Sequence, residues 1–398
     1  MRVARFGDWY LDRYRDKPVK KAVSFGPRKN SLGMSISDRI RCKIMLHSQS
    51  EEVAFSWHGL PQYAARLIRA AAERLDRPCV VVGSRPVVPI DGMEQVLGRP
   101  VQWIDPGKPT SWSEIGLKIP KFYIQSGWSY PAFSALGREV KKAGGCVIGL
   151  SDANWRGDLR QLLLGPAAFR LRHRRHFDAI IVPGHQGERL LRYFGMPRHR
   201  IRMGLYGADP TLFSPGPPLA ERPPEFLFVG QLIRRKDILG LTSAFVEFCR
   251  QRPEWTLRIC GSGELRNQIP VHPKIIVEDF VQPQELASRY YSARFLVLPS
   301  LVEAWGLVVH EASLCGCGLV LSNAVGSADD LASGRNAMRF RAGYKREILA
   351  ALHSAADSSP DWLVGAGFES RALAQNFGPE RFAVEVSSLI SSFAGNSF

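Results

Sequence analysis

The 398-residue chain is 45% hydrophobic, enough for two domains with separate cores, yet no apolar run approaches the roughly 20 residues of a membrane span. Seven scattered cysteines do not suit a disulfide framework, and the polar N-terminus does not resemble a secretory signal, so we expect a cytosolic protein with reduced thiols. The net charge of +16 is concentrated in two regions. Residues 1–43 contain twelve basic and four acidic residues, and residues 156–202 contain eleven basic and three acidic residues.

Residues 1–41 show no periodicity, and we interpret them as a basic N-terminal extension. From Cys42 onward, short apolar runs alternate with amphipathic stretches, which indicates a parallel sheet covered by helices. Residues 42–208 are therefore predicted to form one doubly wound domain. Its predicted elements are strands at 43–47, 79–83, 122–124, 146–150 and 179–182 and a helix near 60–74.

Six prolines between Ala208 and Phe226 exclude a helix or a central strand there, so residues 209–225 are predicted to be a linker. The alternation restarts in residues 226–378, a second doubly wound domain, and residues 379–398 form a last helix that can cross back to the first. The predicted fold class is α/β, with two Rossmann-like domains facing each other across a cleft. The second domain's predicted elements are strands at 226–229, 256–259, 295–298 and 318–321 and helices at 238–250, 284–293, 307–314 and 345–356.

The segment after the strand 295–298 carries the strongest chemical pattern. Gly306 opens a helix, and the free N–H groups near Leu307 and Val308 can hold a phosphate. The glycine lets a ligand approach the backbone closely.

Glu303 precedes this helix and Glu311 lies within it. Glu303 could bind sugar hydroxyls, whereas Glu311 could hold a pair of ribose hydroxyls. Two helical residues at this spacing would be about 12 Å apart along the axis, too far for a paired acid–base device, so we interpret them as two separate anchors. In the alternative interpretation, Glu303 only caps the helix and Glu311 is exposed on it. However, Glu311 lies among apolar residues, where its carboxylate requires a partner.

The segment resembles the donor signature of the retaining glycosyltransferases of family 4, which have the two-domain GT-B fold. The signature is two Glu separated by seven residues after a strand that ends in Pro-Ser. The resemblance extends through most of residues 226–341. It includes the basic turn after the first strand of the second domain, the turn Gly261-Ser-Gly263, and the loop that begins at Phe280-Val281 on the nucleobase side.

By this resemblance, Lys236 and a neighbouring Arg hold the donor diphosphate, and a cationic turn facing a helix N-terminus independently suits a pyrophosphate. Gln231 stands where Arg is usual in the family, and either Arg234 or Arg235 can supply the missing charge. A solvated basic turn is the alternative. The predicted donor-binding residues are Gly230, Arg235, Lys236, Gly261, Phe280, Val281, Glu303, Gly306, Leu307, Val308 and Glu311.

The first domain resembles the family less closely. Gly59 follows its first strand, where the family has an acceptor-side loop, although a simple turn is an equal alternative. Many family members carry a functional His at a later strand end, where this chain has Ser151 and Asp152. Asp152 is the candidate base for an acceptor hydroxyl, with a helix N-cap as the alternative. The predicted catalytic residues are Glu303, Lys236 and Asp152.

The resemblance implies transfer of a hexose from a nucleotide diphosphate sugar, with retention of anomeric configuration, to a glycan or lipid-linked acceptor in polysaccharide biosynthesis. No Asp-x-Asp motif is present, so we expect no metal and no cofactor besides the donor substrate. The alternatives are a nucleotide-sugar 2-epimerase of similar fold and a non-catalytic donor-binding partner subunit. Nucleic-acid binding is not expected, because motifs and interleaved aromatics are missing.

Residues 169–177 are rich in Arg with interleaved Phe and Leu. This pattern predicts contact with an anionic membrane surface, so that the protein would be cytoplasmic and peripheral at the inner face of a membrane. A solvated basic face with no partner is an equal alternative.

Overall fold

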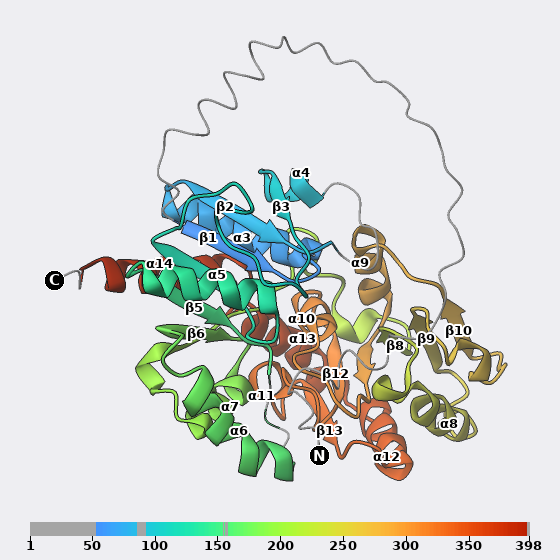
Figure 1. Ribbon diagram of the computed structural model, residues 1–398. Helices are drawn as coiled ribbons and strands as arrows, with labels where there is room; N and C mark the ends of the chain where they lie inside the picture. Colours follow the sequence, from blue (N-terminus) through green and yellow to red (C-terminus); the bar gives the residue numbers. More distant parts are fainter. Residues whose placement is uncertain (1–52, 86–92, 154, 156–157, 396–398) are drawn as a thin grey trace, which may run out of the picture.

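The computed structural model describes residues 53–85, 93–153, 155 and 158–395, which form two α/β units, each built on one parallel sheet (Figure 1). The sheets have seven and six strands and confirm the predicted class, with two doubly wound Rossmann-like units. The extension at 1–41 and the predicted strand at 43–47 lie outside the described residues.

In the first sheet the strands stand in the order β3-β2-β1-β4-β5-β6-β7, so the chain starts near the centre and winds outward in both directions. This order puts the carboxyl ends of all strands at one edge, where ligands bind in such sheets. The strands are β1 Val53–Trp57, β2 Cys79–Gly83, β3 Val101–Trp103, β4 Phe122–Ser126, β5 Cys146–Leu150, β6 Ala179–Val182 and β7 Ile201–Met203. The helices are α3 Gln62–Leu75, α4 Met93–Leu97, α5 Pro131–Lys142, α6 Leu159–Arg172 and α7 His185–Phe194.

The second sheet has the order β10-β9-β8-β11-β12-β13. Its strands are β8 Glu225–Val229, β9 Thr256–Cys260, β10 Ile275–Glu278, β11 Phe295–Leu298, β12 Gly318–Ser322 and β13 Ala337–Phe340. The helices that follow the crossing are α8 Ile238–Phe248, α9 Pro283–Ser292, α10 Leu307–Leu314, α11 Ala328–Leu331, α12 Lys345–Ala356, α13 Pro360–Ala374 and α14 Pro379–Gly395.

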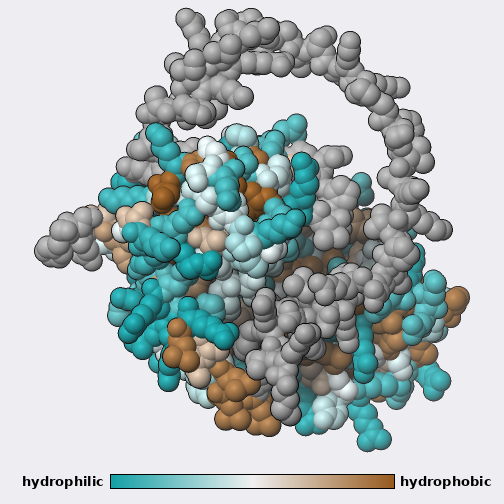
Figure 2. Space-filling view, viewed as in Figure 1, coloured by the Kyte–Doolittle hydropathy of each residue, from teal (hydrophilic) through white to brown (hydrophobic). Residues whose placement is uncertain are grey.

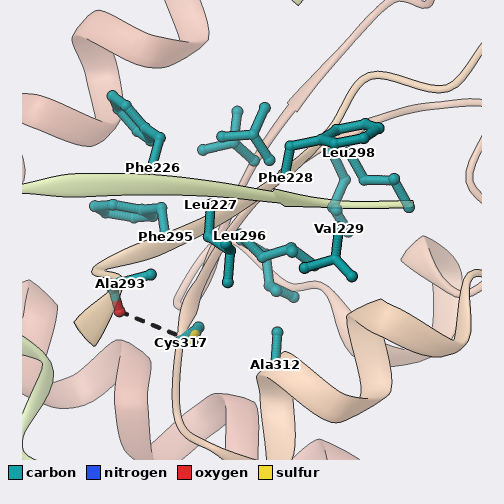
Figure 3. Packing of buried hydrophobic residues seen from close by; sticks show 14 of the residues in the cluster. Phe226, Leu227, Phe228, Val229, Ala293, Phe295, Leu296, Leu298, Ala312 and Cys317 are labelled. Atoms are coloured by element: carbon teal, nitrogen blue, oxygen red, sulfur yellow. Dashed lines mark hydrogen bonds between the residues drawn. The ribbon is translucent and has the colours of Figure 1, made fainter. Parts of the chain in front are cut away.

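The core of the second unit is built around β8, all five residues of which are buried. A central parallel strand is covered by helices on both faces, which is why it is apolar almost throughout. Successive side chains Phe226, Leu227 and Phe228 point to opposite sides of the strand (Figure 3). Phe226 stacks on Trp255 with ring centroids 4.4 Å apart.

The last helix, α14, returns to the first unit and packs along α3 (Figure 1). Its apolar residues recur at helical spacing, and Phe382, Val386 and Leu389 are buried in the same cluster as β1. The chain therefore crosses between the units twice. The two crossings touch, because a Cβ on Gly207 would lie 2.2 Å from the Cα of Gly378.

The proline-rich crossing is held to the second unit by Arg222, which is only 2% exposed. Its guanidinium donates to the carbonyl oxygens of Pro217 at 3.0 Å, Tyr290 at 2.8 Å, Ala293 at 3.0 Å and Cys315 at 2.6 Å. One side chain thereby satisfies four carbonyl groups, and the segment is a fixed part of the second unit rather than a free linker.

The sequence did not predict β1, which lies inside the first sheet, because the first strand was expected at 43–47. It also did not predict the strands β3, β7, β10 and β13, which are the four edge strands of the two sheets. Each has only three or four residues, too few to show a pattern of their own. The helix α13 was also missed. It contains Gly365 and Gly367, which weaken a helical pattern, and is capped by the Ser359 hydroxyl, which accepts from the Trp362 N–H at 3.2 Å.

Replacing Phe382 with Ala should lower the free energy of unfolding by about 3–5 kcal/mol, because the substitution opens a cavity where α14 meets the first unit. Urea unfolding of both proteins measures this. Phe368→Ala removes a phenyl ring that is 64% exposed and should change stability by less than about 0.5 kcal/mol. Equal effects would mean that α14 is not part of the core.

Candidate active site

The turn after β8 supplies the basic residues of the candidate site. Gly230 ends the strand with a φ of +152°, and a Cβ built there would lie 3.7 Å from Cε of Lys236. Asp237 follows in the left-handed region, with a φ of +52°. Its carboxylate lies close to Gly240 in the first turn of α8, because a Cβ on Gly240 would lie 2.6 Å from Oδ1 of Asp237.

Two glycines after β9 let a second turn approach this one. A Cβ on Gly261 would lie 1.9 Å from the carbonyl oxygen of Gly230, and one on Gly263 would lie 2.5 Å from that of Leu232. Any side chain at these positions would push the two turns apart. The glycine pattern thus has a direct steric cause at the carboxyl edge of the second sheet.

The loop between β11 and α10 brings Glu303 to the basic turn. Its Oε2 accepts a hydrogen bond from Nζ of Lys236 and lies 3.5 Å from Nη1 of Arg235. The Ser300 hydroxyl donates to the same oxygen at 3.3 Å. Lys236 and Glu303 are each 8% exposed, whereas Arg235 is half-buried. The three predicted site residues therefore form one charged cluster whose central ion pair is shielded from water.

Backbone contacts hold this loop on both sides. The Leu301 N–H donates to the Arg235 carbonyl at 2.8 Å, and the Arg235 guanidinium donates to the Val302 carbonyl at 2.9 Å. On the other side, the Gly326 N–H donates to the Glu303 carbonyl at 3.0 Å. Of the two arginines predicted to replace the missing charge at Gln231, the structure brings Arg235 to Glu303.

The start of α10 lies against the same cluster. Gly306 is its N-cap, with a φ of +88°, and a Cβ there would lie 3.3 Å from Cγ of Glu303. Leu307 and Val308 occupy the first turn, where N–H groups have no acceptor within the helix. The structure therefore brings the predicted phosphate-binding turn, the basic turn and Glu303 together.

Glu311 is buried in the middle of α10, and the partner that its carboxylate requires is Tyr290 of α9. The Tyr290 hydroxyl donates to Oε2 at 2.8 Å. Burial raises the pKa of Glu311 to about 7, and the hydrogen bond only partly opposes this shift. Sequence reasoning missed Tyr290, because nothing in the local pattern of α9 marks it as a partner of α10.

The predicted nucleobase-side loop lies between β10 and α9. Phe280 is 61% exposed, whereas Val281 is half-buried and packs on the core of the second unit. A solvent-exposed ring beside a fixed aliphatic side chain is a surface on which a flat ring system can pack.

In the first unit, His58 and Gly59 follow β1 and contact the ends of neighbouring strands. The Gly59 N–H donates to the Ser84 hydroxyl at 2.8 Å, and Ser84 lies 2.9 Å from Nδ1 of His58. The His58 ring stacks on Tyr130 with centroids 4.2 Å apart, and burial lowers the pKa of His58. Only Gly59 was predicted here, although His58 stands directly before it in the sequence.

A hollow of about 400 Å³ opens beside these residues at the carboxyl ends of β1, β2 and β3. Its lining combines an indole with acidic, basic and hydroxyl groups. Small-molecule sites commonly have this combination of an apolar surface and a few polar groups. The lining residues are His58, Ser84, Arg85, Trp103, Ile104, Asp105 and Pro106.

Asp152 lies exposed beyond the end of β5. The Tyr206 hydroxyl, from the crossing between the units, donates to its carboxylate at 3.4 Å. The alternative role as a helix cap is wrong, because α6 begins after Asp158, whose carboxylate accepts from the Gln161 N–H at 2.8 Å. Asp152 is thus an accessible carboxylate close to the junction of the two units.

The two units also meet at the start of α7. Nδ1 of His185 lies 2.5 Å from Oδ1 of Asp330 in α11, and a Cβ on Gly184 would lie 2.6 Å from the Trp305 ring. Trp305 stands two residues after Glu303, so the first unit packs directly on the loop that carries the charged cluster. Among the described residues, no three His, Cys, Asp or Glu side chains gather closely enough to hold a metal ion.

Comparisons with known proteins agree with this geometry. Residues 223–357 match the family model described as glycosyl transferases group 1. The D-inositol 3-phosphate glycosyltransferase of Rhodococcus jostii is 27% identical over 220 residues, which are 50% of this chain and 48% of that protein. The glycogen synthase of Mycobacterium tuberculosis is 31% identical over 142 residues, 34% of each chain. The chain thus spans about half the length of the first of these relatives and a third of the second.

Solved structures share the fold across nearly the whole molecule. Anabaena HepE in complex with UDP and glucose has a TM-score of 0.66 at 14% identity, covering 86% of this chain and 100% of that one. Sucrose-phosphate synthase from Thermosynechococcus elongatus has a TM-score of 0.66 at 17% identity, covering 87% and 100%. These likenesses establish the GT-B arrangement of the two sheets.

Lys236→Met should lower the free energy of unfolding by about 2–4 kcal/mol, because it leaves the buried Glu303 carboxylate without its main counter-charge. Adding Glu303→Gln should recover part of this loss. A double-mutant cycle by urea unfolding measures the coupling. If the two losses simply added, the contact between these side chains would contribute nothing to stability.

The contribution of Glu311 to the stability of the protein should fall as the pH rises from about 4.5 to about 7, because the folded state holds a proton on Glu311 that the unfolded state has released. Glu311→Gln removes this group, so its stability relative to the native protein should increase by up to about 3 kcal/mol across that range. Unfolding at a series of pH values measures the difference. A constant difference would contradict the raised pKa.

Proposed function

Because the chain belongs to the group 1 glycosyltransferases, we propose that it transfers a hexose from a nucleotide diphosphate sugar to an acceptor, with retention of anomeric configuration. The observation that carries the proposal is the cluster of Arg235, Lys236 and Glu303 beside the first turn of α10. In this cluster, Arg235 and Lys236 supply positive charge for a diphosphate, and Glu303 supplies a carboxylate for sugar hydroxyls.

In this proposal the donor lies along the carboxyl edge of the second sheet. Arg235, Lys236 and the N–H groups at Gly306, Leu307 and Val308 bind the diphosphate, and the Gly230 and Gly261 turns allow its close approach. The nucleobase packs on the loop at Phe280 and Val281. Glu311, held by Tyr290, accepts from the ribose hydroxyls.

Breaking the bond from the anomeric carbon to the diphosphate leaves a positively charged sugar and extra negative charge on the leaving group. Lys236 and Arg235 stabilise the leaving group, which lowers the barrier most when water is excluded. Glu303 orients the sugar, and we propose no metal ion or other cofactor in this step. Retention follows from the family to which the chain belongs.

The acceptor side of the proposal lies on the first unit. Asp152, exposed near the junction, accepts the proton of the acceptor hydroxyl, and Gly59 lies in the acceptor-side loop. The hollow at the ends of β1, β2 and β3 is large enough for part of a glycan or lipid-linked acceptor, and Trp103 offers a face for a sugar ring. We place the protein in polysaccharide assembly at the cytoplasmic side of a membrane.

Glu303→Gln should reduce turnover roughly 100-fold with little change in donor affinity, because it disturbs the position of the reacting sugar. Glu311→Ala should weaken donor binding at least about tenfold, because it removes an acceptor for the ribose. Thermal shifts with UDP, GDP, ADP and their sugars measure binding, and NMR of the product formed with added acceptors measures transfer and anomeric configuration.

Glu285→Gln, on the exposed surface of α9, is the matched control and should behave as the native protein. Donor binding without transfer would favour a donor-binding partner subunit. Conversion of the donor sugar at C2 without any acceptor would favour a 2-epimerase. Native donor affinity in Glu311→Ala would contradict the assignment of the ribose site.

A further inference from the structure

The helix α6 presents leucines to solvent. Leu159, Leu163, Leu164 and Leu171 are 75, 71, 61 and 86% exposed. The outer face of a surface helix is ordinarily polar, because it contacts water along its whole length. In Figure 2 a hydrophobic patch lies at the lower edge of the face shown, where Figure 1 places α6.

The exposure of these leucines follows from how the opposite face of α6 packs. Gln161, Gly165 and Phe169 are buried at intervals of four residues. A Cβ on Gly165 would lie 2.5 Å from the Phe194 ring of α7, so the helix is pressed closely against its neighbour. With this face fixed, the row of Leu159, Leu163, Ala167 and Leu171 is directed outward.

Exposed arginines surround the C-terminal end of this row: Arg170, Arg172, Arg174 and Arg175. The acidic side chains of the region are already engaged. Asp178 binds Lys141 at 2.8 Å, Glu188 binds Arg198 at 3.2 Å, and Asp158 caps the helix. The positive charge of these arginines is thus available to an external anion.

We propose that α6 and the arginines that follow it dock on an anionic lipid bilayer, with the leucine row in the interface and the guanidinium groups on lipid phosphates. A convex helix with a single apolar row and a basic end suits the plane of a bilayer surface. The sequence pattern predicted membrane contact in this region from Arg with interleaved Phe and Leu. The prediction was wrong for the two phenylalanines, which do not face solvent. Phe169 and Phe177 are 2% and 1% exposed and belong to the core.

The position of α6 in the fold would bring the junction of the two units close to the membrane. The helix follows β5, whose carboxyl end precedes Asp152, and α7 then begins at the contact between His185 and Asp330. Docking would hold the junction of the two units beside the bilayer, within reach of a lipid-linked molecule. In the part of the chain that the structure describes, no helix is long and apolar enough to span a bilayer. The inference rests on the proposed function for the location at a membrane and adds the surface that would hold the protein there. Vesicle binding tests that surface separately from sugar transfer.

The test is cosedimentation of the full-length protein with vesicles of phosphatidylcholine alone or with about one third phosphatidylglycerol. The native protein should bind the anionic vesicles and bind less as salt is raised. Replacing Leu159, Leu163 and Leu171 together with Ser should reduce the partition coefficient at least about tenfold. Replacing Arg172, Arg174 and Arg175 with Gln should reduce it about fivefold per arginine.

Matched controls carry Val271→Ser with Val364→Ser, or Arg250→Gln with Arg346→Gln, on exposed positions of the second unit, and should bind as the native protein. Circular dichroism and thermal unfolding check that the variants fold. Absence of binding to anionic vesicles, or binding that the leucine variant retains, would overturn the proposal. So would a native dimer that the leucine variant dissociates, since the row would then be an interface between copies of this chain.

Discussion

The buried ion pair between Lys236 and Glu303 is the interaction on which the candidate site depends. The two residues come from different turns of one sheet and are each 8% exposed, so neither charge can lose its partner without a large cost. Their contact fixes the loop after β11 against the turn after β8, and Gly261 lets a third turn join them. The result is a rigid, charged edge with the first turn of α10 beside it. Fixed charges and N–H groups of this kind are preorganised to stabilise negative charge on a bound group.

The two segments that cross between the units are both bound to α10. His310, directly before Glu311, accepts from the Ala208 N–H at 2.8 Å and donates to the Ala374 carbonyl at 2.9 Å. Burial lowers its pKa to about 4, so the imidazole is neutral and can make both bonds near neutral pH. One side chain thus connects the helix of the candidate site to both segments through which the chain crosses between the units.

Function divides unevenly between the units. In the second unit, charged and glycine residues from different turns form one connected cluster, and the family model matches residues 223–357, which include this cluster. In the first unit the polar residues are dispersed among the ends of β1, β2, β3 and β5, beside the hollow and near Asp152. The charged cluster and the hollow thus lie on different units.

The sequence by itself determined the two parallel sheets, most of their central strands and the α10 helix, because buried parallel strands are continuous apolar runs and glycine marks a helix start. It also indicated Glu303 and Glu311 through their positions before and within a helix, and Lys236 through a basic turn after a strand and the family resemblance. Only the tertiary structure decided that Arg235 faces Glu303 and that Tyr290 is the partner of Glu311. Edge strands, side-chain partners from distant segments and the outward leucines of α6 depend on packing between elements, which local periodicity does not record.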